Sequence, residues 1–227
     1  MSNAVLILGD SGTGKSTSMM TLDPAETFVV NVIGKALPFK GFKKNYKTIC
    51  KNEDGTDSNG NYIVTDKAAQ ISSLISYVNS KRPEIKNFII DDCQYVMSNE
   101  YMRRSKETGY GKFTDIGNDA FMIVEKINSC RDDLNFFVMF HSVIDKHGIA
   151  KCKTIGNVID EKMTFEGRFT NVLHAIASDG RYFFLTQHNG VQMAKTPMGM
   201  FEDKIIPNDL KYVGEKIHSY FNDDIAA

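Results

Sequence analysis

The sequence of 227 residues carries no excess of charge of either sign and no long apolar run. Its 27 Lys and Arg residues nearly balance 28 Asp and Glu residues, so the formal net charge is −1, which excludes a uniformly basic nucleic-acid coat and leaves a local basic patch open. A membrane-spanning helix needs about 18 consecutive apolar residues, which this chain lacks. No basic segment precedes the first apolar run, so we expect no cleaved signal peptide.

Cysteine is scarce too. The four cysteines, Cys50, Cys93, Cys130 and Cys152, form no C-x-x-C pair, which predicts a cytoplasmic chain with reduced thiols. Hydrophobic residues make up 42% and charged residues 24% of the sequence, as in an ordinary globular protein and unlike a disordered chain. No linker-like segment or internal repeat divides the sequence, so we expect residues 1–227 to form a single domain.

The apolar pattern predicts an α/β fold. Short, continuously apolar runs, typical of strands buried on both faces of a parallel sheet, lie at residues 4–8, 27–32, 88–90 and 134–140. Apolar side chains recur at helical spacing between Asp66 and Pro83, at 116–127 and at 210–221, with Asp66 as the expected N-cap of the first helix. We therefore expect a mainly parallel central sheet flanked by helices.

Asp-Gly and Asn-Gly pairs predict antiparallel strands in addition. The polar segment 51–61 lies between strand-like runs at 46–50 and 62–65 and predicts a β-hairpin. Runs at 172–177, 181–186 and 191–194 are separated by such pairs and predict a C-terminal antiparallel β-meander.

Residues 9–16 match the phosphate-loop pattern G-x-x-x-x-G-K-[ST] in full, between a predicted strand and an expected helix. Glycines let the backbone wrap around a phosphate with its N–H groups inward, and the helix N-terminus adds positive potential. Lys15 would place an exposed charge between the β- and γ-phosphates, and Ser16 would offer its hydroxyl to Mg²⁺. The expected nucleotide contacts are Gly9, Asp10, Ser11, Gly12, Thr13, Gly14, Lys15, Ser16 and Thr17. No guanine-reading Asn-Lys-x-Asp motif is present, which favours ATP with Mg²⁺.

Such a loop needs an acidic partner at the end of a neighbouring strand, and the run 87–92 supplies it. Asp91 would hold Mg²⁺. Asp92 would polarise the attacking water, or would instead cap the helix that starts at Gln94. His141 and Ser142 end the apolar run 134–140, where His141 would sense the γ-phosphate or would simply end the strand.

These features resemble the RecA-like core of P-loop ATPases: a P-loop strand, a second strand, an apolar strand ending in Asp91, and a strand ending in a polar sensor, His141, 50 residues further on. Residues 37–41 and 194–197 are similar to small phage-encoded RecA-like ATPases, a group that includes the single-strand annealing ATPases of the Sak type. The resemblance implies a Mg²⁺-dependent ATPase in the host-cell cytoplasm. Val30–Gly34 departs from the family, because it lacks the catalytic Glu usual just after the second strand.

The resemblance further implies a homo-oligomer that acts on single-stranded DNA in phage recombination or annealing. Two loops would bind DNA through cations and aromatic rings, and the alternative for both is ordinary solvated surface. The residues are Arg103, Arg104, Lys106, Tyr110 and Lys112 after the acidic strand, and Lys146, Lys151 and Lys153 after the sensor. Lys195 or Arg181 would enter a neighbouring subunit's γ-phosphate site, unless it is only an exposed cation at a strand end.

Two other functions fit the same residues. One is a motor ATPase for packaging or helicase-like work on the same core. The other is a nucleotide-gated regulatory protein that does not bind DNA. Salt-dependent binding to single-stranded oligonucleotides would exclude the regulatory protein, and translocation or unwinding would identify the motor.

Overall fold

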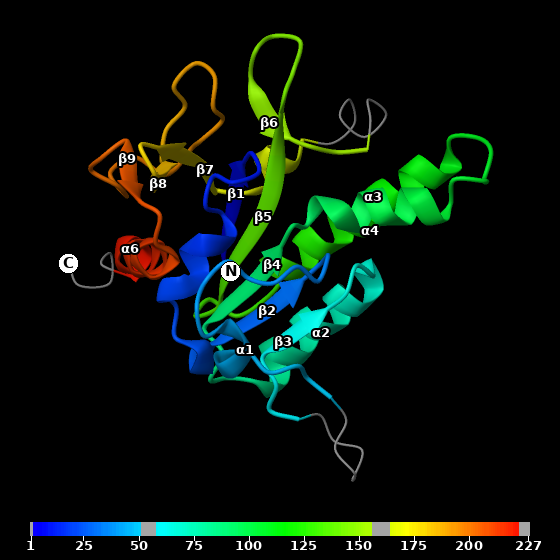
Figure 1. Cartoon of the computed structure of the whole chain (residues 1–227), viewed down its shortest axis with the longest axis horizontal. Helices are drawn as coiled ribbons and strands as arrows, with labels where there is room; N and C mark the ends of the chain where they lie inside the picture. Colours follow the sequence, from blue (N-terminus) through cyan, green and yellow to red (C-terminus); the bar gives the residue numbers. More distant parts are fainter. Residues whose placement is uncertain (1, 51–57, 156–163, 223–227) are drawn as a thin grey trace.

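The computed structural model describes residues 2–50, 58–155 and 164–222. One sheet forms its centre, in the strand order β3-β2-β4-β5-β1-β7-β8-β9, with β6 paired to β5 (Figure 1). The strands are β1 (Asn3–Gly9), β2 (Thr27–Asn31), β3 (Tyr62–Val64), β4 (Asn87–Asp91), β5 (Asn135–Ile144), β6 (Ala150–Cys152), β7 (Asn171–Ser178), β8 (Arg181–Leu185) and β9 (Ile205–Pro207). From β3 to β7 every neighbouring pair is parallel, and β7, β8 and β9 are antiparallel. The expected α/β fold, with a mainly parallel central sheet flanked by helices and a C-terminal antiparallel meander, is confirmed.

Helices cover both faces of the sheet (Figure 1). They are α1 (Phe42–Asn45), α2 (Ala68–Lys81), α3 (Gln94–Arg103), α4 (Gly111–Asn128) and α6 (Leu210–Asn222), with 3₁₀ helices η1 (Ser16–Thr21), η2 (Pro24–Glu26) and η3 (Phe165–Arg168). Alternate residues of each central strand point to opposite faces. Leu6 and Leu8 thus pack in the core under α2, α3 and α4, and Val5 and Ile7 pack in the core under η1 and α6. Burial on both faces explains the continuously apolar strand sequences.

The carboxyl ends of β1, β2, β4 and β5 meet at one edge of the sheet. In the register, Asn31 lies beside Asp91, and Gly9 lies beside His141. The phosphate loop, the acidic pair and the sensor residue, which are far apart in the sequence, are therefore neighbours. Figure 1 shows two structures projecting outward from this core, the α3–α4 helix pair and the β5–β6 hairpin.

Three local expectations are wrong. Residues 62–64 pair in parallel with β2 as β3, and Thr48 bridges Tyr62 in parallel, so no hairpin joins them; residues 51–57 lie outside the described residues. Residues 191–194 form no strand, because this segment runs between β6 and β7, where Gln192 bridges Ala150 and Lys195 bridges Val172. The third strand of the meander is β9 instead. Asp66 accepts hydrogen bonds from Asn99 and Arg103 and does not cap α2.

The four cysteines are free, and three are buried. Among the described residues, no helix has both the length and the apolar character needed to cross a bilayer.

Candidate functional site

The loop from Gly9 to Ser16 has the backbone of a phosphate cradle. Gly9, Gly12 and Gly14 have φ angles of +151°, +82° and +88°, values that L side chains rarely adopt. A Cβ atom on Gly9 would lie 2.8 Å from the carbonyl oxygen of Ala175, and one on Gly14 would lie 2.6 Å from Cγ of Tyr182. The loop therefore requires glycine at these two positions for space as well as for conformation.

Lys15 is buried, contrary to the exposed charge that the sequence predicts. Its side chain is 6% exposed, and Nζ donates to the carbonyl oxygens of Gly9 and Asp10, both at 2.7 Å. Burial lowers the pKa of Lys15, while the charges of Asp92, Asp91 and Asp10 oppose that shift. The ammonium thus folds back onto the carbonyls of its own loop.

The expected helix after the loop is only the six-residue 3₁₀ helix η1, which begins at Ser16. Its first residue faces the acidic strand: Ser16 Oγ donates to Oδ1 of Asp91 at 2.8 Å. Asp91 is 4% exposed, and burial, followed by the charge of Asp92, raises its pKa to about 6. A buried carboxylate held against a hydroxyl is a pair of hard oxygen ligands, which fits Mg²⁺.

The described residues contain no group of three or more His, Cys, Asp and Glu side chains that would hold a metal by themselves. Mg²⁺ in nucleotide sites takes one or two protein oxygens and completes its shell with phosphate oxygens and water. Ser16 and Asp91 suffice for such a shared ion.

Asp92 lies just beyond β4, with a φ of +61°, an unusual backbone angle for a non-glycine residue. Its Oδ1 lies 3.1 Å from Nε2 of His141. Burial raises the pKa of Asp92, but the hydrogen bond and charge of His141, with the charges of Lys15 and Lys35, lower it overall. Cys93, not Asp92, occupies the N-cap position of α3, and no side chain caps that helix. The helix-cap alternative for Asp92 is therefore excluded.

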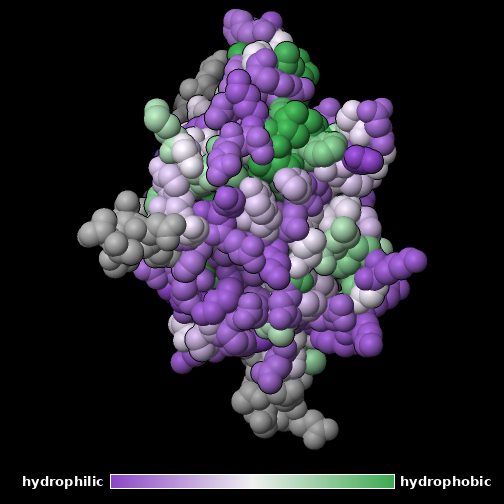
Figure 2. All heavy atoms as spheres, turned by 90° about the vertical axis from the view of Figure 1, so that its left-hand side faces the viewer, coloured by the Kyte–Doolittle hydropathy of each residue, from purple (hydrophilic) through white to green (hydrophobic). Residues whose placement is uncertain are grey.

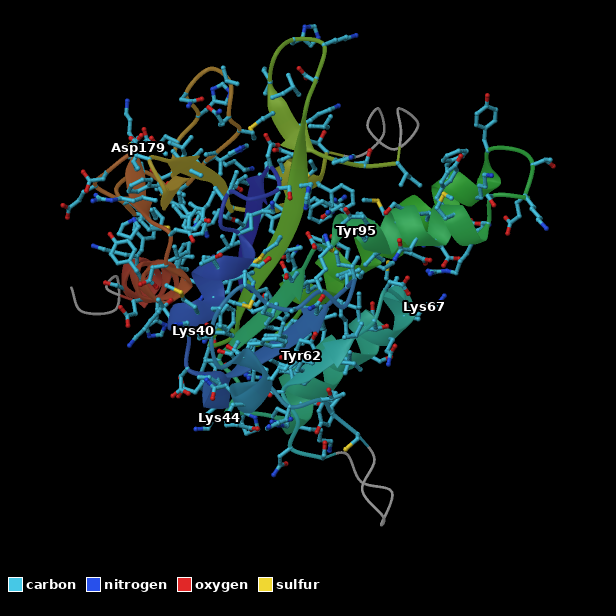
Figure 3. The ribbon with its side chains drawn as sticks, viewed as in Figure 1. Lys40, Lys44, Tyr62, Lys67, Tyr95 and Asp179 are labelled. Carbon is cyan, nitrogen blue, oxygen red and sulfur yellow. The ribbon has the colours of Figure 1, made fainter. Side chains whose placement is uncertain are left out.

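His141 and Ser142 connect the acidic pair to the phosphate loop. Ser142 Oγ donates to Oδ1 of Asp10 at 2.6 Å, and the backbone N–H of His141 donates to Oε1 of Gln94 at 3.2 Å. The ring of Tyr95 packs edge-on against His141, with centroids 6.1 Å apart. In Figure 3, Tyr95 lies on one side of β1 and Asp179, at the β7–β8 turn, on the other.

These groups surround one pocket of about 260 Å³. Its lining residues are Ser11, Gly12, Gly14, Lys15, Ser16, Thr17, Lys35, Ala36, Pro38, Asp91, Asp92, His141 and Tyr182. Sequence reasoning missed Lys35 and Tyr182. Lys35 directly follows Val30–Gly34, the segment in which a catalytic Glu is usual, and that position could have indicated a role in the site. Tyr182 lies on β8 and reaches the loop only through the β7–β8 hairpin, which the sequence pattern does not reveal. A wider hollow of about 590 Å³ lies near Asn3 and Asn171, at the opposite ends of these strands.

Two of the cations after the acidic strand, Arg103 and Arg104, pair with carboxylates from α3 and α4 and from the loops before α2 and after α3. Arg103 pairs with Asp66 and Glu100, and Arg104 with Glu107 and Asp115. The Nζ of Lys112, which is buried, donates to the carbonyl oxygens of Arg104 and Glu107. Lys106 and Tyr110 are exposed beside them, near the tip of the α3–α4 pair.

The second group of cations belongs to the β5–β6 hairpin, which continues directly from His141. Lys146 and Lys153 are exposed, and Lys151 is half-buried on β6. The backbone N–H of Lys153 donates to the carbonyl oxygen of His141 at 2.9 Å. Exposed Val143 and Ile144 precede the tip. The hairpin is thus tied to the sensor residue at its base.

Lys195 is exposed but does not line its own chain's pocket. Its backbone exchanges two hydrogen bonds with Val172, a residue level with Leu6 in the middle of β1. The backbone of Lys195 is thus held level with the middle of β1, and not at the strand end that carries the phosphate loop.

A complete phosphate loop and an acidic strand end that meets its serine lie together at one edge of a mostly parallel sheet, which is the arrangement of a P-loop phosphate site. No protein-family model and no curated protein sequence matches this chain.

Among solved structures, the chain is similar to an ATPase from the type III secretion system of pathogenic bacteria, with a TM-score of 0.44 and 11% identity. The alignment covers 76% of this chain and 50% of that chain, so this chain spans about half its length. A likeness of this size adds nothing to what the strand order already gives.

Proposed function

We propose that the protein binds ATP with Mg²⁺ in the 260 Å³ pocket and hydrolyses it there. The observation that carries the proposal is the hydrogen bond from Ser16 Oγ to Asp91 at 2.8 Å, with the Asp92–His141 pair on the same pocket. The Ser16–Asp91 bond places both expected Mg²⁺ ligands beside the phosphate loop. Asp92 is then free of the metal and can orient water.

The residues take distinct roles in this proposal. Lys15 leaves the carbonyls of Gly9 and Asp10 and binds the β- and γ-phosphates. Mg²⁺, held by Ser16 and Asp91, would neutralise phosphate charge. Asp92 accepts a hydrogen bond from the attacking water, a role for which its lowered pKa keeps it ionised.

The test is Mg²⁺-dependent phosphate release from ATP by the wild type, by Lys15→Ala and by Lys44→Ala as a control. Lys44 is an exposed lysine on α1 at the foot of Figure 3, outside the pocket. We expect turnover in the wild type and the control, and none in Lys15→Ala. Turnover in Lys15→Ala equal to wild type would place the activity elsewhere.

As the finer function we propose action on single-stranded DNA, as the resemblance to Sak-type phage ATPases implies. The β5–β6 hairpin supports this, because its exposed cations and apolar residues continue from His141. Figure 2 shows apolar side chains gathered near the upper end of a mainly hydrophilic face, at the height of that hairpin in Figure 1. Exposed Val143 and Ile144 lie on β5 of that hairpin, and exposed Val191 lies beside it, where its carbonyl oxygen accepts from the N–H of Ala150.

Affinity for a single-stranded oligonucleotide, measured against salt, tests this function. Each phosphate contact adds about 0.7 to the slope of log affinity against log salt, so Lys146→Ala with Lys153→Ala should flatten it by roughly 1.4. Arg103→Ala with Arg104→Ala should change it less, because those cations already have carboxylate partners. A larger change in slope for the Arg103 and Arg104 variant than for the Lys146 and Lys153 variant would place DNA at the α3–α4 tip. No DNA binding by the wild type would favour a regulatory ATPase.

A further inference from the structure

A loop outside the recognised motifs forms one wall of the phosphate pocket. β2 ends at Asn31, Gly34 turns the chain with a φ of +71°, and Lys35 then lines the pocket. The register pairs Asn31 with Asp91 on the adjacent strand. The loop therefore leaves the sheet beside the two aspartates, at the place where the family's catalytic Glu is missing.

Buried Asn31 fixes this loop through its side chain. Its Nδ2 donates to the carbonyl oxygen of Lys35 at 2.6 Å and to the hydroxyl of Tyr62 at 3.0 Å, and its Oδ1 accepts from the N–H of Gly34 at 2.8 Å. The Lys35 side chain is exposed and makes no hydrogen bond or ion pair with any other described residue. Its backbone is held in place while its ammonium stays available to a ligand.

The charges in the pocket call for a second cation. Two carboxylates, Asp91 and Asp92, face one lysine, Lys15, and a triphosphate remains anionic with Mg²⁺ bound. Lys35 lines the same pocket as these three side chains, so its ammonium can supply the second positive charge there.

We propose that Lys35 contacts the γ-phosphate of the nucleotide bound in its own subunit and stabilises the charge that develops during transfer. The inference rests on the proposed ATP hydrolysis. In that step the water oxygen bonds to the γ-phosphorus, the bond to the β–γ bridging oxygen breaks with its electron pair kept by ADP, and the water proton passes to Asp92. Lys35 forms no covalent bond and acts through charge alone.

The test compares Lys35→Met and Lys35→Arg with Lys40→Met. Lys40 is an exposed lysine of the same connecting segment that does not line the pocket (Figure 3). We expect Lys35→Met to lower kcat by at least about tenfold, Lys35→Arg to recover most of it, and Lys40→Met to match wild type. ADP affinity should stay within about twofold in Lys35→Met, because ADP lacks the γ-phosphate. Wild-type kcat in Lys35→Met, or an equal loss of ATP and ADP affinity, would overturn the inference.

Mixing two variants distinguishes action within one subunit from action on a neighbour. Lys15→Ala subunits have no working site but retain Lys35. If Lys35 serves its own subunit, adding them to Lys35→Met subunits restores nothing, and restored turnover would overturn the assignment to the same subunit. If the wild type itself releases no phosphate, the proposed hydrolysis fails, and the contact is then judged by whether Lys35→Met weakens ATP binding more than ADP binding.

Discussion

Replacing Asp91 by Asn should make the nucleotide-free protein more stable at neutral pH. Burial and the neighbouring Asp92 raise the pKa of Asp91 from 3.8 to about 6. The folded state therefore favours the protonated carboxyl, and the unfolded chain releases that proton more easily. Asp91 therefore contributes stability at low pH, and this contribution is lost as the pH rises from the pKa of Asp91 in the unfolded chain through its pKa in the folded protein.

The magnitude follows from the shift of about 2 pKa units. At about 1.4 kcal/mol per unit, the ionised carboxylate costs roughly 3 kcal/mol above pH 6. Asn has no such charge and can still accept the hydrogen bond from Ser16 Oγ. For a domain of this size the gain corresponds to a Tm higher by about 6–12 °C. The same change should weaken Mg²⁺-dependent ATP binding, since the amide is uncharged.

The assay is urea unfolding of wild type and Asp91→Asn between pH 4 and 8, without nucleotide. The difference in unfolding free energy between Asp91→Asn and wild type should grow from pH 4 to about 6.5 and then level off. Asp179→Asn is the control, because it neutralises an exposed carboxylate at the β7–β8 turn. If Asp91→Asn is less stable than wild type at pH 7.5, or the difference does not change with pH, the argument from burial fails.

Three further changes test other parts of the site. Gly14→Ala would place a Cβ 2.6 Å from Cγ of Tyr182 at a φ of +88°, so we expect lower stability, by roughly 1–3 kcal/mol, and no ATP binding by calorimetry; normal binding would show that the loop tolerates the methyl group. Asp92→Asn should bind ATP but slow hydrolysis by about 10²–10⁴-fold in single-turnover assays, and normal hydrolysis would assign the water to another residue. Lys195→Ala should lower turnover only at protein concentrations where subunits assemble, and equal turnover of the variant and wild type at every concentration would remove Lys195 from the reaction.

The sequence alone determined the phosphate loop, the acidic strand and the class of fold. The loop is readable because its residues are contiguous and each has a local requirement, such as the positive φ of Gly12. The central strands are readable because burial on both faces makes them continuously apolar. Local patterns misplaced residues 62–65 and 191–194, since strand pairing depends on which partner is free at the sheet edge and not on the strand itself.

Only the tertiary structure decided which distant groups meet. Asp91 contacts Ser16 across 75 residues, and Lys35 and Tyr182 enter the pocket because the order of the strands brings their loops to the edge of β1. The burial of Lys15 and the ion pairs of Arg103 were equally invisible in the sequence. Whether a charge is exposed, buried or paired is a property of the surrounding elements, and a linear pattern specifies only its type.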